Sequence, residues 1–341
     1  MLASFAASPD SGRHEVDETK ENAMEDSYDV VVVGGGAAGL GGALALSRAR
    51  RSVLVIDAGA PRNAPAGHIH NYLGREGTPP GELLAIGREE VAGYGGEIVT
   101  GTVTSADKIG DGQFRVTLAD GATVRARRLL VTTGLVDVLP DIPGVAERWG
   151  RDVLHCPYCH GWEVRDQPIG VLAGSPLAVH QALMWRQWTE NVTLFLNDAD
   201  EPTGEEYEQL AARGIAVIDG GVAGLEVQDD RLTGVRLRAG QVFSLAAVVV
   251  PPLFRARAEF LTSLGLDTTE MEMAGHVIGT AVASDATGAT AVPGVWVAGN
   301  VADPKAQVIV AAGAGLSAAA AINADLVMDD TSLAVAGALS R

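Results

Sequence analysis

Cysteine is scarce in this chain: only two of its 341 residues are cysteines. Several structural disulfides are therefore excluded, and a chain with a single pair of thiols suits the reducing cytoplasm. Aromatic residues make up only 5% of the chain, whereas glycine occurs 42 times. This composition favours helices packed closely on sheets over a β-sandwich, and we predict a cytoplasmic α/β protein.

Positive charge is also scarce, because 25 Lys and Arg residues stand against 43 Asp and Glu residues, which gives a formal net charge of −18. Such a charge disfavours binding to nucleic acid or to an anionic membrane surface. We expect no apolar run long enough to cross a bilayer. Residues 1–26 lack the basic start and apolar core of a signal peptide, and we predict a disordered tail there.

Short β-branched runs alternate with Ala- and Leu-rich runs, which is the pattern of βαβ units. The pattern occurs twice, and the last helix is expected from about Gln307 to Met328. We predict two Rossmann-like nucleotide-binding domains of the three-layer ββα type, the second inserted in the first. The expected limits are 27–142 with 253–341 for the first, discontinuous domain, and 143–252 for the inserted one.

A glycine-rich motif lies between the first predicted strand and helix. Gly34 permits the tight turn, Gly36 allows a pyrophosphate to approach the backbone, and Gly39 lets helix and strand pack closely. The phosphates would then lie at the helix N-terminus, next to Ala37 and Ala38. Asp57 ends the second strand, where a carboxylate accepts from ribose hydroxyls. The set predicts a dinucleotide site.

The corresponding turn of the second domain is degraded. Ala173 and Ser175 stand where glycines are needed, and only Gly174 between them remains. Both side chains would crowd a pyrophosphate. The next strand ends in Asn197-Asp198 without an arginine for a 2′-phosphate. Tight NADPH binding is therefore not predicted, whereas weak NADH binding through Asp198 stays open.

The two cysteines form Cys156-Pro-Tyr-Cys159, flanked by His155 and His160. This spacing allows a small disulfide and lets one thiol be held as a thiolate, which predicts a redox-active pair. Zinc binding would need a second, distant pair of ligands, and we predict no metal. His160 is the candidate base, since imidazole titrates near neutral pH, and His155 is expected to pack.

Other side chains near the pair leave two interpretations open. His68 and His70 share a face of an extended segment, and would either line the site or lie in solvent. Four aromatic residues would form either an apolar wall for a flat substrate or part of the core: Tyr158, Trp162, Trp185 and Trp188.

Further motifs carry a resemblance to a known family. Val131-Thr-Thr-Gly134, Val297-Ala-Gly-Asn-Val-Ala-Asp303 and Ala306-Gln-Val308 follow the pattern of the low-molecular-weight thioredoxin reductases, which the chain resembles from Tyr28 to about Asp329. The resemblance implies a homodimeric flavoprotein in which FAD carries the redox chemistry. The residues that it implies for FAD binding are Gly34, Gly36, Ala37, Ala38, Gly39, Asp57, Asn71, Thr133, Gly134, Gly299, Asn300, Gln307 and Val308. Asn300 stands where the family has aspartate, and its amide is expected to reach the ribityl chain.

The chain departs from the reductases at the thiols, because His160 follows the second cysteine where they have aspartate. This pattern resembles the dithiol oxidase branch, which closes the disulfides of gliotoxin and holomycin. The resemblance implies an FAD-dependent oxidase that converts a small-molecule dithiol to a disulfide, while O₂ reoxidises the flavin to give H₂O₂. By analogy, Cys156 would meet the substrate and Cys159 would lie nearest the flavin.

Two alternatives remain at this point. An NAD(P)H-dependent thioredoxin-disulfide reductase-like enzyme would use the same cysteines, with a thioredoxin-like protein as partner. A flavin-binding redox sensor would present them to a partner without turnover.

Overall fold

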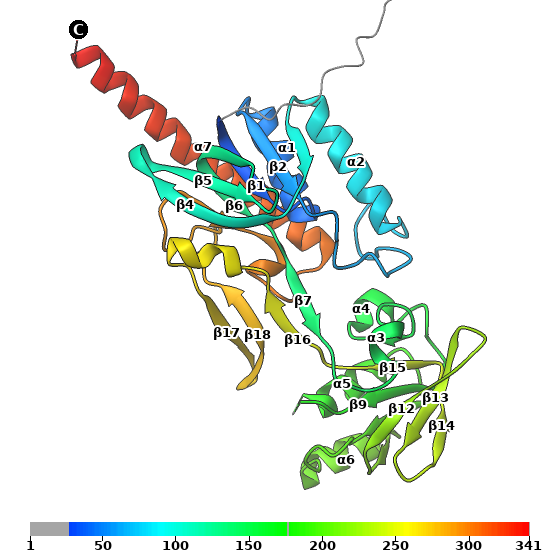
Figure 1. The fold of residues 1–341 in the computed structure, drawn as a ribbon. Helices are drawn as coiled ribbons and strands as arrows, with labels where there is room; N and C mark the ends of the chain where they lie inside the picture. The colour runs from blue at the N-terminus through cyan, green and yellow to red at the C-terminus, as the bar shows by residue number, and fades with distance from the viewer. Residues whose placement is uncertain (1–26, 176, 341) are drawn as a thin grey trace, which may run out of the picture.

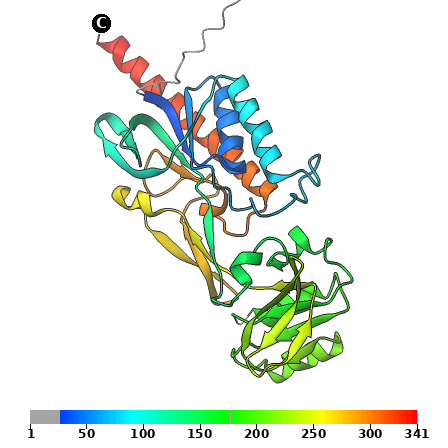
Figure 2. The same cartoon turned by 45° about the vertical axis from the view of Figure 1, so that its right-hand side comes forward.

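The computed structural model describes residues 27–175 and 177–340, so the predicted tail lies outside the described residues. The chain forms two α/β bodies, which Figures 1 and 2 show one above the other. The upper body contains both the start and the end of the described chain, and the lower body is inserted between them. This arrangement agrees with the predicted fold class.

The upper body is built on a seven-stranded sheet in the order β3-β2-β1-β6-β5-β4, with β19 also paired to β6. Strands β1, β2, β3, β6 and β19 run parallel, and β4, β5 and β6 form an antiparallel layer. The strands are β1 (Ser27–Val33), β2 (Val53–Asp57), β3 (Glu97–Thr100), β4 (Val103–Ile109), β5 (Gln113–Leu118), β6 (Thr123–Val131) and β19 (Val295–Val297).

Helices cover one face of this sheet, and β4 and β5 extend over the other. The helices are α1 (Ala37–Arg48), α2 (Pro80–Gly93) and α7 (Val308–Leu339). Helices α1 and α7 approach so closely that a Cβ on Gly315 would lie 2.0 Å from the carbonyl oxygen of Ala38. Close packing through glycine therefore aligns the starts of two helices at one edge of the sheet.

The lower body repeats the plan with the five-stranded order β11-β10-β9-β15-β8. Its helices are α3 (Val145–Arg148), α4 (Pro157–His160), α5 (Ala178–Trp185) and α6 (Gly204–Ala212). Its strands are β8 (Val153–Leu154), β9 (Ile169–Leu172), β10 (Val192–Phe195), β11 (Ala216–Ile218) and β15 (Ala247–Val249), with the antiparallel layer β12 (Val222–Gln228), β13 (Arg231–Leu237) and β14 (Val242–Ser244).

Two strands connect the bodies. The chain leaves the upper body along β7 (Leu135–Val138) and returns along β16 (Leu253–Ala256), and the two strands pair antiparallel. Strands β17 (Thr268–Met273) and β18 (His276–Val282) complete this sheet in the order β17-β18-β16-β7. The predicted domain limits fall beside these connections and stay a prediction.

Helix α7 differs from the sequence prediction in two respects. It ends at Leu339 instead of near Met328. By length and composition it is also apolar enough to cross a membrane, so the expectation that no run is long enough was wrong. Small residues on one side of the helix, such as Ala311, Gly315 and Ala318, are buried against the rest of the upper body. The last turns of the helix protrude from it (Figure 1).

Candidate active site

A single cavity of about 1020 Å³ lies between the two bodies and brings most of the predicted site residues together. The upper body contributes the glycine-rich turn, the end of β2, the segment after β6 and the start of α7. The lower body contributes the cysteines and its own degraded turn. The predicted residues that line it are Gly34, Gly36, Ala37, Ala38, Asp57, Thr133, Gly134, Gly299, Asn300, Gln307, Val308, Cys156, Cys159 and His160.

The first glycine motif has the geometry that a dinucleotide needs. Gly34 has φ +107°, and a Cβ there would lie 2.5 Å from the carbonyl oxygen of Thr132. A Cβ on Gly39 would lie 1.9 Å from the carbonyl oxygen of Gly34, so this glycine allows the helix to pack on the turn without lining the cavity. A Cβ on Gly36 would meet nothing within 4 Å, which leaves open space at the N-terminus of α1 for a pyrophosphate.

A second helix N-terminus faces the same cavity. Gln307 is the N-cap of α7, and its side chain accepts no hydrogen bond from the first turn of that helix. Gln307 and Val308 line the cavity, so backbone N–H groups of α7 lie beside it. Two uncapped helix starts and Asp57 fit FAD, whose phosphates and ribose need N–H donors and a carboxylate.

Two predicted cofactor residues have other partners in the structure. The Nδ2 atom of Asn300 donates to the carbonyl oxygens of Asp303, at 3.0 Å, and Ala306, at 2.9 Å. An aspartate has no proton to donate there, so the amide shapes the loop that leads into α7. Asn71 does not line the cavity, and its Nδ2 atom donates to the carbonyl oxygen of Tyr158 at 2.6 Å, which ties the upper body to the cysteine segment.

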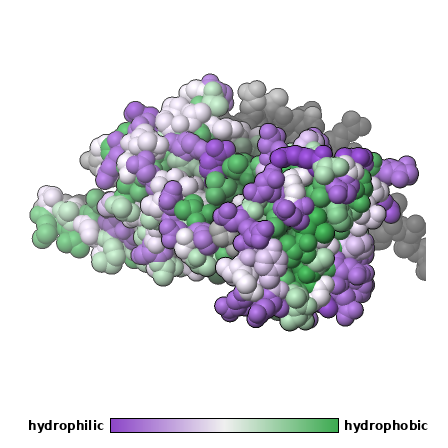
Figure 3. Space-filling model, turned by 90° about the horizontal axis from the view of Figure 1, so that it is seen from below, coloured by the Kyte–Doolittle hydropathy of each residue, from purple (hydrophilic) through white to green (hydrophobic). Residues whose placement is uncertain are grey.

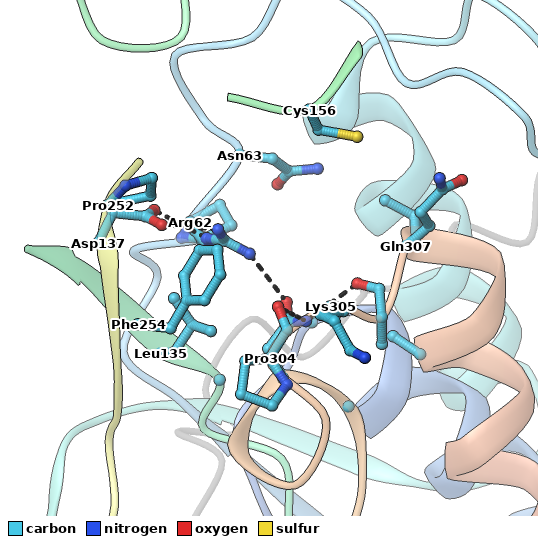
Figure 4. A pocket seen from close by; sticks show the side chains of 18 of the residues that line it. Arg62, Asn63, Leu135, Asp137, Cys156, Pro252, Phe254, Pro304, Lys305 and Gln307 are labelled. Atoms are coloured by element: carbon cyan, nitrogen blue, oxygen red, sulfur yellow. Dashed lines mark hydrogen bonds and ion pairs between the residues drawn. The ribbon is translucent and has the colours of Figure 1, made fainter. Parts of the chain in front are cut away.

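The cysteines begin the short helix α4, with Cys156 as its N-cap and Pro157 in its first turn. Both are thiols and both line the cavity. Figure 4 shows the sulfur of Cys156 and the side chain of Gln307 projecting into the same space. The thiols and the start of α7 therefore face one cavity.

The two thiols have different acidities. The pKa of Cys156 is lowered to about 7, chiefly because the thiol of Cys159 donates to its sulfur, and also because backbone N–H groups and Arg62 face it. The pKa of Cys159 is raised, because its proton is held by Cys156 and because burial disfavours a second charge. In the reduced pair, Cys156 is therefore the thiol that loses its proton first.

Alkylation of the reduced protein should report this difference. We expect iodoacetamide to label Cys156 with a rate that rises through a midpoint near pH 7 and falls about tenfold per pH unit below it. Because Cys159 supplies the main hydrogen bond, Cys159→Ala should move the midpoint upward. Peptide mass spectrometry across a pH series gives both results; preferential labelling of Cys159 would contradict the assignment.

The histidines beside the cysteines have distinct surroundings. Burial lowers the pKa of His160, so its imidazole is neutral at pH 7 and able to accept a proton. His155 is half-buried: its Nδ1–H donates to the carbonyl oxygen of Val250 at 3.2 Å, and its ring packs edge-on against Phe254. These contacts agree with the packing role expected for His155.

His68 and His70 both line the cavity. His70 lies between two carboxylates, with Nδ1 2.6 Å from Glu76 Oε1 and Nε2 3.5 Å from Glu163 Oε1. His70, His160 and Glu163 also line a smaller cavity of about 210 Å³. Protons leaving His160 therefore have titratable groups nearby.

The aromatic residues divide between the two interpretations. Trp185 is fully buried and belongs to the core of the lower body. Tyr158 is 59% exposed, lines the cavity and packs edge-on against Trp188. Trp162 is exposed outside the cavity lining, with the guanidinium of Arg165 4.0 Å from its ring centre. Of the four aromatic residues, only Tyr158 therefore lines the cavity, and Trp188 supports its ring from behind.

The degraded turn of the lower body also borders the cavity. Gly174 and Ser175 line it, and the hydroxyl of Ser175 accepts from the N–H of Leu177 at 3.3 Å. At the strand end, Asp198 pairs with Arg238 at 2.7 Å. Sequence reasoning missed Arg238 because it lies 40 positions away, and its pairing leaves Asp198 engaged by protein.

Sequence reasoning also missed the surroundings of Arg62. Its guanidinium donates to both carboxylate oxygens of Asp137, at 2.6 and 2.8 Å, and its Cζ lies 5.2 Å from the ring centre of Phe254. Figure 4 shows these three side chains at the cavity wall. Within residues 27–175 and 177–340, no cluster of three or more His, Cys, Asp or Glu side chains is arranged to hold a metal ion.

Fold and site define a flavin-dependent oxidoreductase that acts on sulfur groups. Residues 28–315 match the pyridine nucleotide-disulphide oxidoreductase family, and the chain belongs to this family, whose thioredoxin reductase-like members use FAD. It is 32% identical to the thioredoxin reductase sirT of Leptosphaeria maculans over 315 residues, 87% of this chain and 93% of the relative.

Two solved structures share the whole arrangement. The crystal structure of HlmI superimposes with a TM-score of 0.86 at 47% identity, covering 93% of this chain and 98% of that one. An oxidoreductase from Agrobacterium tumefaciens gives 0.83 at 37% identity, with 89% and 99% covered.

Proposed function

We propose that the protein is an FAD-dependent oxidase that converts a small-molecule dithiol to a disulfide, with O₂ as the final electron acceptor and H₂O₂ as the second product. The observation that carries this proposal is that Cys156 and Cys159 line the same cavity as the intact glycine motif. The degraded turn at Ala173 and Ser175 supports thiols, rather than NADPH, as the source of electrons.

The exchange itself needs only the cysteines and a base. One substrate thiolate attacks a sulfur of the Cys156–Cys159 disulfide, whose S–S bond breaks as a mixed disulfide forms. The second substrate thiol then attacks the mixed disulfide, which closes the product disulfide and leaves the enzyme pair reduced. Neutral His160 accepts a thiol proton, a contribution worth about 10²–10⁴-fold. When bound, FAD supplies the acceptor for the two electrons of the reduced pair.

One anaerobic experiment tests the proposal. The yellow protein is mixed with dithiothreitol, NADPH or NADH, and loss of the flavin absorbance is followed. We expect rapid bleaching by the dithiol, slow or no bleaching by the nucleotides, and H₂O₂ formation when air is admitted. Rapid bleaching by NADPH with thioredoxin reduction would instead identify a reductase, and bleaching without repeated turnover would identify a sensor.

We also propose that the protein is a homodimer. The family resemblance supports this, and so does the protruding end of α7, where Val327, Met328, Leu333, Val335 and Leu339 are all exposed. Hydrophobic residues are visible on the protruding left side of the molecule in Figure 3. A second copy would bury them. Light scattering should give twice the 35.2 kDa chain mass, and a mass of one chain at all concentrations would refute the dimer.

A further inference from the structure

Arg62 joins three segments that are distant in sequence. It lies on the loop after β2 in the upper body, and its partners lie on the two strands that connect the bodies: Asp137 on β7 and Phe254 on β16. The carboxylate of Asp137 is only 7% exposed and accepts two hydrogen bonds from the guanidinium. A planar fork that binds a carboxylate with two bonds fixes orientation as well as distance.

The connecting strands determine where the cysteines lie. Strands β7 and β16 pair with each other through Leu253–Val138 to Ala256–Leu135. The lower body, with α4 and both thiols, is held by these two connections and by contacts across the cavity such as that of Asn71 with Tyr158. A change in the direction of β7 and β16 would therefore move Cys156 and Cys159 relative to the glycine motif.

We propose that Arg62 is a positioning residue that clamps β7 and β16 to the upper body and thereby holds the cysteine pair against the flavin cavity. Its bonds to Asp137 fix the outgoing strand, and its packing on Phe254 fixes the returning one. The Oδ1 atom of Asn300, 3.5 Å from the guanidinium, adds a contact to the loop before α7. This inference goes beyond the proposed function, because it holds whichever donor reduces the pair.

Two features indicate that the Arg62–Asp137 pair acts as a clamp and is not an ordinary surface ion pair. The Arg62 side chain is 30% exposed and its partner is nearly buried, so the pair is shielded from solvent. The charge of Arg62 also reaches the thiols, since it contributes to the lowered pKa of Cys156. Loss of the clamp should therefore affect both the connections and the acidity of the pair.

Hydrogen exchange tests the clamp directly. Wild type, Arg62→Gln, Arg62→Lys and Asp137→Asn are compared as holoproteins, with Arg236→Gln as control, because Arg236 pairs with Glu226 on the remote β12–β13 ribbon. We expect amides of β7 and β16 to exchange about tenfold faster in Arg62→Gln and Asp137→Asn. Exchange should be unchanged in the control. Unchanged exchange of both strands in these two variants would overturn the proposal.

Flavin reduction separates positioning from charge. With the donor that bleaches wild type, the rate should fall about 10- to 100-fold in Arg62→Gln, as for other misplaced reacting groups. Arg62→Lys keeps the charge but loses the fork, so it should keep the alkylation midpoint of Cys156 yet lose most of the rate. Full activity in Arg62→Lys would overturn the clamp in favour of charge alone.

A double variant covers the case in which Asp137→Asn does not fold. Arg62→Gln/Asp137→Asn removes the pair without leaving a buried carboxylate or guanidinium alone. If the residues act as one clamp, its rate should equal that of Arg62→Gln, because the second change removes nothing further. A further loss of about tenfold or more would mean that the residues act separately and would overturn the proposal. The hydrogen-exchange comparison needs no substrate, so its result tests the clamp even if the proposed dithiol oxidation fails.

Discussion

Cys159→Ser should abolish dithiol oxidation, with a loss of about 10⁴-fold or more, while the protein keeps its FAD. The reason is chemical: without the second sulfur, the enzyme cannot form the disulfide that accepts electrons from the substrate. Cys159 lies in α4 of the lower body, apart from the glycine motif, and serine has nearly the same shape. Turnover is measured as O₂ consumption, and FAD content from the absorbance spectrum.

The same variant should trap an intermediate. The remaining Cys156 can attack an oxidised monothiol such as glutathione disulfide, releasing one glutathione thiolate and forming a mixed disulfide that mimics the intermediate. Neither the bound half nor the enzyme then has a second thiol to resolve it. Mass spectrometry should show this adduct on Cys156, with Cys156→Ser as the control that lacks it. Sustained turnover by Cys159→Ser would disprove the two-cysteine mechanism.

Gly36→Glu should give a folded but colourless protein. A Cβ at this position meets nothing within 4 Å, so the side chain fits. The glutamate side chain would lie at the N-terminus of α1. Its carboxylate would fill the position expected for the FAD phosphates and would repel their negative charge. We expect the affinity for FAD to fall about 100-fold or more, because losing the contacts of the charged phosphates with the helix N-terminus costs several kcal/mol.

Gly81→Glu is the matched control, because a Cβ on Gly81 also meets nothing and its residue is exposed outside the cavity lining. It adds the same charge without touching the site and should remain yellow. The ratio of flavin to protein absorbance after purification, with circular dichroism as a check on folding, gives the result. Normal FAD content in Gly36→Glu would place the cofactor elsewhere.

The first dinucleotide motif was predictable because its signal is local: strand, glycine turn and helix follow one another directly. Strand β6 has a weaker local signal, because Arg127 and Arg128 interrupt its apolar pattern. In the structure, Arg127 pairs with Asp29, and Arg128 pairs with Asp325. The charges are satisfied by tertiary partners, so a single strand continues through them.

The end of α7 shows the same effect. Asp329 and Asp330 look like a polar stop, and the prediction ended the helix just before them. Both carboxylates instead bind Arg127, and Asp330 also binds Arg51 at 2.7 Å. Likewise, nothing near Arg62 in the sequence indicates Asp137, which lies 75 positions later. Pairings between distant charges are set by the folded topology, and a single sequence does not display them.

Helix α7 has a thermodynamic consequence that follows from its length. Its 32 residues span about 48 Å, from Gln307 beside the flavin cavity to the exposed apolar end proposed for a second copy. A rigid helix that contributes to both places would couple their equilibria, because FAD binding that orders its first turn would also order the surface at its other end. FAD binding and subunit association would then strengthen each other by the same factor. Loss of FAD would weaken the dimer, and dilution to monomers would weaken FAD binding.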